Sequence, residues 1–226
     1  MGRELPILFN TDRVQDILDD RKKATRRIIK FPVNKLTNER PKAERVWVYE
    51  NTLYGEKLHF YERPFYSFYV KLPYRTGDIL YVRETWCNAN KDGVEPDYYY
   101  FADTRICEDY DETEWIWRPS IHMPKAAARI WLKVTDVRAE QLQDMTLDDF
   151  LNEGVVLRPE AFNDPENAYW QARDIFKGIW DSTIPKAKLP EYGWNANPWV
   201  WVIEFAPCEK PAAEKEAESH ETDNAF

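Results

Sequence analysis

The segment Pro198–Phe205 constrains the fold more than any other stretch, because it is a nearly continuous apolar run in which Glu204 is the only charged residue. Such runs are typical of a strand at the centre of a sheet or closing one. Residues 127–137 alternate between apolar and polar and predict a second long strand. Shorter strand patterns lie at residues 6–10, 25–31, 46–49, 57–61, 65–72, 79–86 and 98–102. Those at 46–49 and 57–61 flank residues 51–56, which contain Gly55, and predict an inserted β-hairpin. Together they predict an α+β chain built on a small β-barrel.

Three helices are predicted between these strands. The first has Thr11 as its N-cap and ends near residues 20–21. The second is capped by Thr146 and stopped by Gly154. The third spans residues 164–180, with a proline at its first position and its apolar residues on one face. We therefore expect the helices to lie beside the strands.

Charge divides the chain into two parts. Residues 207–226 hold six acidic and two basic residues, a net charge of −4, so −5 of the chain's −9 belongs to residues 1–206. The acidic segment lacks a core pattern and is predicted to be disordered. An acidic body argues against a protein that coats long duplex DNA, which normally presents a basic face. A local pocket for a small ligand remains possible.

Several other classes of site are not indicated. The three cysteines and three histidines are scattered and show no spacing typical of a metal site, so no metal or other cofactor is predicted. An odd cysteine count predicts reduced thiols in a cytoplasmic protein. We find no apolar run of about 18 residues, so no membrane association is expected.

Residues 21–30, RKKATRRIIK, are the strongest candidate for a functional site. Six of the ten are Lys or Arg, none is acidic, and the rest of the chain is acidic. Like charges this close repel one another, so the stretch needs a ligand or a solvated surface to explain it. It lies where the first helix gives way to a strand, and turns between rigid elements are where sites tend to lie.

One carboxylate falls on an unexpected face of a predicted strand. Side chains alternate along residues 79–86, which puts Glu84 on the side of the apolar residues. An inward carboxylate must be paired or lie at a cavity mouth. Glu84 is therefore either a site carboxylate or a salt-bridge partner of Arg27 or Arg129.

Three further side chains are candidate ligand contacts. Trp86 and Trp117 have flat faces on which a nucleic-acid base would stack, although packing in the core is the alternative. His122 lies between two prolines and either contacts a ligand or is a structural histidine.

The stretch Asp16–Arg27 resembles the signature of the ASCH domain family, G-x-K-x-x-T-x-R. Lys22, Thr25 and Arg27 fill the Lys, Thr and Arg positions, and Asp20 stands where the family has Gly. A Gly there takes backbone angles that Asp adopts less easily, although Asp tolerates the left-handed region better than most residues.

Other parts of the chain resemble the longer, phage- and prophage-associated members of that family. Residues 77–86, GDILYVRETW, are similar to their G-D-x-L-x-V-R-E-x-W strand, and residues 120–124 and 195–202 are also similar to that branch. The resemblance runs from Pro6 to Phe205. It implies a PUA-like β-barrel over residues 1–206, with insertions at about 32–72 and 104–125.

The family resemblance also implies a function. ASCH domains are proposed to bind RNA or modified nucleosides, and one branch hydrolyses N4-acetylcytidine with a Lys, a Thr and a later Glu. Lys22 and Thr25 match the first two, and spacing puts Glu153 at the third. Some other members are reported as ribonucleases, so fold alone does not settle activity.

The chemistry expected at this site is metal-independent amide hydrolysis. Thr25 would be the nucleophile and Lys22 its base, since neighbouring cations lower the pKa of a lysine. Glu153 or Glu84 would pair with Lys22 or carry a proton to the leaving amine. Arg27 and Arg26 are the candidate contacts to a phosphate or to the developing oxyanion.

Three alternatives remain open. The same cleft would serve a binding module for a modified base or a short single strand of RNA, without turnover. A ribonuclease is the second. The third is a phage protein that binds a host protein through its acidic surface.

Overall fold

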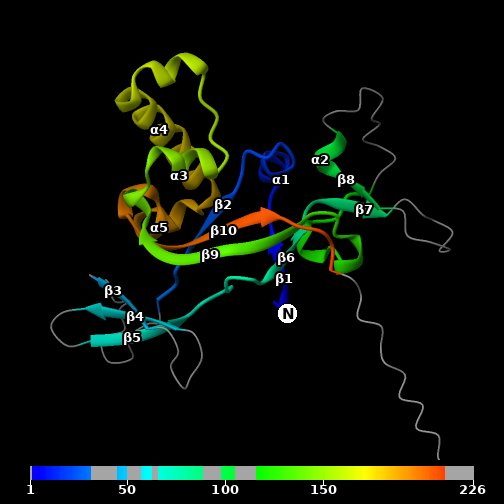
Figure 1. The fold of residues 1–226 in the computed structure, drawn as a ribbon, viewed down its shortest axis with the longest axis horizontal. Helices are drawn as coiled ribbons and strands as arrows, with labels where there is room; N and C mark the ends of the chain where they lie inside the picture. Colours follow the sequence, from blue (N-terminus) through cyan, green and yellow to red (C-terminus); the bar gives the residue numbers. More distant parts are fainter. Residues whose placement is uncertain are drawn as a thin grey trace, which may run out of the picture.

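The computed structural model describes residues 2–31, 45–49, 57–62, 66–88, 98–104 and 116–211. Its centre is a five-stranded mixed sheet (Figure 1). The strands follow the order β1 (Glu4–Leu8), β6 (Ile79–Arg83), β9 (Trp131–Gln141), β10 (Trp199–Pro207) and β2 (Ala24–Ile28). β1 runs parallel to β6, and the other neighbours are antiparallel. The strand expected from the apolar run is β10, which lies between two neighbours and is almost wholly buried up to Phe205.

The expected small β-barrel is not closed. β1 and β2 are the two edges of the sheet. The carbonyl of Leu8, at the end of β1, accepts a hydrogen bond of 2.7 Å from the Arg27 side chain of β2. A side chain therefore links the two edges where a closed barrel would need backbone pairing. The α+β class is confirmed, as an open sheet with helices.

Two helices follow their sequence signals closely. α3 (Leu147–Asn152) has a complete capping box in which Thr146 and Asp149 bond each other's backbone N–H. Gly154 follows with a φ of +92°, which favours glycine and ends the helix. α4 (Pro165–Thr183) starts directly after its N-cap, Asp164, as expected, and extends three residues beyond residue 180.

The first helix, α1 (Thr11–Leu18), corrects two predictions, and one is its end, which lies at Leu18 and not near residues 20–21. Its N-cap is Asn10, one residue before Thr11, because the Asn10 side chain accepts the Arg13 N–H. After the helix, Asp20 adopts a left-handed φ of +55°. Asp20, which stands where the resembled signature has Gly, therefore has the backbone conformation for which Gly is suited.

The remaining elements differ from the predictions mainly at their ends. The strand expected over residues 79–86 is split into β6 and β7 (Trp86–Asn88), and β7 pairs with β8 (Tyr98–Tyr100). The predicted continuation to residue 102 is instead α2 (Phe101–Thr104). The strand expected from residue 127 starts at Trp131, because two 3₁₀ turns precede it. Other short elements are α5 (Leu189–Tyr192), η1 (Ser120–His122), η2 (Lys125–Ala127), η3 (Leu142–Asp144), η4 (Pro159–Asn163), η5 (Lys186–Lys188) and η6 (Trp194–Ala196).

A separate three-stranded antiparallel sheet contains the expected hairpin. It consists of β3 (Arg45–Tyr49), β4 (Lys57–Glu62) and β5 (Tyr66–Lys71). Residues 32–44, 50–56 and 63–65 of the predicted insertion at 32–72, and residues 105–115 of the one at 104–125, lie outside the described residues. Residue 207 belongs to β10, so the predicted disordered tail does not begin there, and residues 212–226 lie outside the described residues.

Two apolar clusters hold the sheet and the helices together. One joins the sheet to α1 through Val14, Ile17, Leu80 and Ile203. The other packs α3 and α4 around the fully buried ring of Phe150. Figure 1 shows α3, α4 and α5 grouped at one end of the sheet, where β9 curves toward α3. This arrangement brings the end of α3 to the start of β2.

Candidate active site

A pocket of about 240 Å³ lies where the end of β1, α1, β2 and α4 meet. One wall is polar and contains Lys22, Thr25, Arg27 and Glu153. The apolar lining comes from the end of β1 and from the second half of α4, and consists of Leu8, Phe9, Phe176, Ile179 and Trp180. The basic turn singled out in the sequence thus forms part of a concave surface.

The backbone of the turn is held from both sides, which positions Lys22. The carbonyl of Asp16 in α1 accepts the N–H groups of Arg21 and Lys22, each at 2.9 Å. On the other side the Lys23 N–H donates to the carbonyl of Asn152, at the end of α3, at 2.7 Å. These bonds satisfy carbonyls that helix ends leave open. The turn is therefore part of the joint between α1 and α3.

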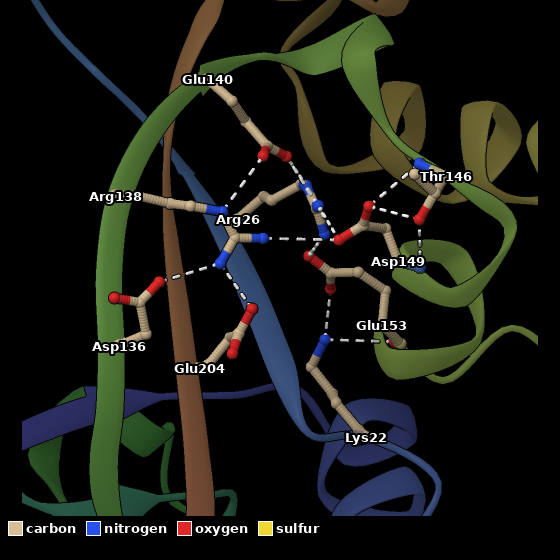
Figure 2. Close-up of polar contacts among 9 residues, drawn as sticks. All are labelled: Lys22, Arg26, Asp136, Arg138, Glu140, Thr146, Asp149, Glu153 and Glu204. Carbon is tan, nitrogen blue, oxygen red and sulfur yellow. Dashed lines mark hydrogen bonds and ion pairs between the residues drawn. The ribbon is translucent and has the colours of Figure 1, made fainter.

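Lys22 and Glu153 form a buried ion pair, although 131 residues separate them in the chain. The Lys22 Nζ lies 2.5 Å from Glu153 Oε2 and also donates to the Glu153 backbone carbonyl at 3.1 Å (Figure 2). Only 1% of the Lys22 side chain and 6% of the Glu153 side chain are exposed. The structure therefore brings Glu153 to the Lys22 amine.

Burial lowers the pKa of Lys22, because the charged ammonium loses water. Glu153 opposes this effect, while the nearby charges of Arg13 and Arg27 add to it. The sequence attributed the lower pKa of Lys22 to crowding by the neighbouring cations of the basic stretch. The structure corrects this in part, because burial is the largest cause. Arg21 is paired with Asp16 and Asp19, and Lys23 with Asp20, so these cations have acidic partners of their own.

Thr25 lies in the same wall, on β2. Its residue is 5% exposed, and its backbone faces Ile203 of β10 in the register of the sheet. Within the described residues its hydroxyl has no hydrogen-bond partner. The Oγ1 atom is thus available to a molecule in the pocket.

Arg27 is the exposed cation of the pocket. Its guanidinium lies 5.2 Å from the centre of the Phe9 ring and donates to the Leu8 carbonyl. In the part of the chain that the structure describes, this is its one hydrogen bond, so its other N–H groups are open to a ligand. A guanidinium has five N–H groups and binds oxyanions well.

Arg26 has a different environment. Its side chain has no exposed surface and bonds the carboxylates of Glu140, Asp149 and Glu153 (Figure 2). Although it borders the pocket, its guanidinium is directed at these acids. Arg26 is therefore buried and held by these acids, and it is not placed to bind a substrate, the role expected of it in the sequence.

The other candidates lie elsewhere and do not line this pocket. Glu84 is 1% exposed and binds Arg129 through both oxygens, at 3.0 and 3.1 Å, which is one of the two salt bridges considered for it. Trp86 is buried in an apolar cluster, and Trp117 packs edge-on against Phe101. His122 is exposed on η1. The structure thus brings together Lys22, Thr25, Arg26, Arg27 and Glu153, and not these four.

Sequence reasoning missed part of the pocket. Arg13 donates to the carbonyl of Glu153 at 3.1 Å and to Asp16, and it lines the pocket. The α4 residues Ile179 and Thr183 also line it. Helical periodicity identified an apolar face of α4 but not that its last two turns border a pocket.

The chain matches no protein-family model, no curated protein and no solved structure. Within the described residues, no group of three or more His, Cys, Asp or Glu side chains is placed to hold a metal ion. No helix in that part of the chain is long and apolar enough to span a membrane.

Proposed function

We propose that the pocket binds a modified nucleoside and hydrolyses an N-acyl amide on its base, of the N4-acetylcytidine type. The observation that carries the proposal is that one pocket is lined by the buried pair of Lys22 and Glu153 and by Thr25, whose hydroxyl has no hydrogen-bond partner within the described residues. These are the three residues that the ASCH resemblance implies for amide hydrolysis. They come from two segments far apart in the chain and line one pocket.

Thr25 is the nucleophile in this proposal. The neutral Lys22 amine takes the hydroxyl proton, and Oγ1 forms a bond to the carbonyl carbon of the acyl group. Negative charge develops on the carbonyl oxygen, where the open N–H groups of Arg27 stabilise it. The C–N bond then breaks, and the Lys22 ammonium returns the proton to the leaving amine.

Water completes the reaction. It attacks the ester on Thr25 and gives a proton to Lys22, and the Thr25 oxygen recovers a proton as the carboxylic acid leaves. Glu153 stabilises the ammonium form of Lys22 that exists between these transfers. Burial works in the opposite direction and favours the neutral amine. The two effects together suit a group that must both accept and return a proton.

The size of the pocket supports a small substrate. Pockets for drug-sized ligands typically measure about 300 to 1,000 Å³. A volume of about 240 Å³ accommodates one modified base or its acyl group, and not a run of nucleotides. The apolar wall from α4 suits a flat ring, while the polar wall presents the reacting groups.

Incubation with N4-acetylcytidine, followed by chromatography of released cytidine and acetate, tests the proposal. Wild type is expected to release both in equal amounts. Thr25→Val, which keeps the shape and removes the hydroxyl, and Lys22→Met are expected to lower kcat by at least about 100-fold, as for loss of a nucleophile or its base. Lys23→Met is the matched control, because Lys23 is exposed and paired with Asp20.

A binding module without turnover is the second candidate. It is favoured by the 2.5 Å contact between Lys22 and Glu153, because a carboxylate stabilises the ammonium form of lysine, which cannot accept a proton. In that case N4-acetylcytidine or short single-stranded RNA would bind without cytidine release, and Arg27→Ala would weaken binding. Release that persists in both Thr25→Val and Lys22→Met would refute the catalytic assignment.

A further inference from the structure

Arg26 is the most completely paired side chain around the pocket. Its guanidinium bonds Glu140 of β9 at 2.6 and 2.9 Å and Asp149 of α3 at 2.8 Å. A third carboxylate, that of Glu153, lies 3.4 Å from its NH1 atom. We call Glu140, Asp149 and Glu153 the acidic cluster. Figure 2 shows the three acids converging on Arg26 from two sides.

Glu153 connects this cluster to Lys22. Its Oε1 atom faces Arg26, and its Oε2 atom accepts the bond from the Lys22 amine. One carboxylate thus lies between two buried cations. A change in charge at Arg26 would reach Lys22 through this shared carboxylate, because charges in the protein interior are poorly screened.

The charges facing Lys22 can be listed by element. α3 ends in Glu153, α1 contributes Arg13 and Asp16, and β2 contributes Arg27. α4 contributes no charged residue to the described pocket wall. Behind Glu153 lie Glu140 and Asp149, which Arg26 neutralises in part. Arg138 contacts the same two acids from the exposed side, at 3.4 and 3.5 Å.

We propose that Arg26 is a positioning residue that balances the acidic cluster, so that the Lys22 amine can both give up and take back a proton. The inference rests on the proposed role of Lys22 as the base. Without Arg26, the charge of Glu153 at the Lys22 amine, and of Glu140 and Asp149 behind it, would be less compensated, and the Lys22 ammonium would be stabilised. The amine would then lose its proton only at higher pH.

The test is the pH dependence of kcat/KM for N4-acetylcytidine, measured beside the ¹⁵N signal of the Lys22 amine. Arg26→Gln is expected to move the midpoint of both by about one pH unit to higher pH, the size typical of one nearby charge. Arg26→Lys keeps the charge and loses the forked geometry, so its midpoint is expected near that of wild type. Glu140→Gln removes an acid and is expected to move the midpoint to lower pH.

Lys23→Gln is the matched control. It also removes one cation from the turn, but Lys23 is exposed and pairs with Asp20, which lies outside the acidic cluster, so no shift is expected. If Arg26→Gln does not fold, Arg26→Lys and Glu140→Gln still distinguish a charge effect from a purely structural one. A charge effect leaves the midpoint unchanged in Arg26→Lys and moves it to lower pH in Glu140→Gln. A purely structural effect predicts no such shift in Glu140→Gln.

The two proposals fail in different ways. Identical midpoints in wild type, Arg26→Gln and Glu140→Gln would overturn the role of Arg26, even if N4-acetylcytidine is hydrolysed. Absence of hydrolysis in wild type would overturn the proposed function, whereas the ¹⁵N titration of Lys22 would still report whether Arg26 sets its protonation.

Discussion

The α carbon of Gly154 lies directly against the carboxylate of Asp16. A Cβ atom at residue 154 would come within 2.9 Å of Asp16 Oδ2, and the φ of +92° is one that side chains other than glycine's rarely allow. Because Glu153 precedes this glycine, the close approach of α1 and the end of α3 sets the place of the Glu153 carboxylate in the pocket.

Gly154→Ala is therefore expected to destabilise the protein by about 1 to 3 kcal/mol, the cost of strained backbone. The free energy of unfolding in urea measures the effect. Gly178→Ala is the matched control, because Gly178 lies within α4 with open space around it and alanine is the better helix former. Equal effects of the two substitutions would contradict this account of Gly154.

Asp20→Gly is expected to stabilise the protein by about 0.5 to 1 kcal/mol, because glycine adopts a φ of +55° without strain. The change also removes the ion pair with Lys23, but both side chains are exposed and such pairs contribute little. Asp19→Gly, at the preceding position with a φ of −83°, should not stabilise. A loss of stability in Asp20→Gly would show that its side chain matters more than its backbone angle.

Asp149 should make stability depend on acid pH. Burial alone would raise the pKa of Asp149, but hydrogen bonds from Thr146 and Arg26 outweigh it and lower that pKa below 3.8. The unfolded chain then binds the proton more readily, so this contribution is present above about pH 4 and is lost as the pH falls through the folded pKa.

Asp149→Asn is accordingly expected to cost about 1 to 2 kcal/mol at pH 7, the range for a helix cap, and less at pH 3. Urea unfolding at both pH values measures this difference. Asp148→Asn changes a neighbouring acid outside the capping box and should show a smaller effect at pH 7. A cost that stays constant between pH 7 and pH 3 would refute the assignment.

Glu84→Gln separates a structural role from a role in the pocket. Burial raises the pKa of Glu84, and Arg129 holds both of its oxygens. We expect a loss of roughly 2 kcal/mol, below the range for fully buried pairs because Arg129 is 26% exposed. Hydrolysis per folded molecule should not change, since Glu84 does not line the pocket.

Asp103→Asn is the control for Glu84, because it removes the more exposed acid bound to the same arginine. Its cost is expected to stay below about 1 kcal/mol. A fall in kcat for Glu84→Gln with unchanged stability would instead make Glu84 part of the site.

Local features of the fold could be predicted from sequence. Thr146 and Gly154 delimit α3, Pro165 begins α4, and the apolar run became the covered strand β10. Such signals act on the backbone conformation within a few residues of their own position. The split of residues 79–86 was not predictable in this way, because it depends on pairing of β7 with β8.

The sequence by itself determined a basic turn between a helix and a strand, with Lys22, Thr25 and Arg27 at a characteristic spacing. Only the tertiary structure decided which carboxylate joins them. The sequence left both Glu84 and Glu153 as candidates, and the packing of α3 against α1 and β2 put Glu153 at the Lys22 amine. Tertiary packing likewise turned Arg26 inward and left Arg27 exposed, because burial of a charge depends on partners that lie more than a hundred residues away.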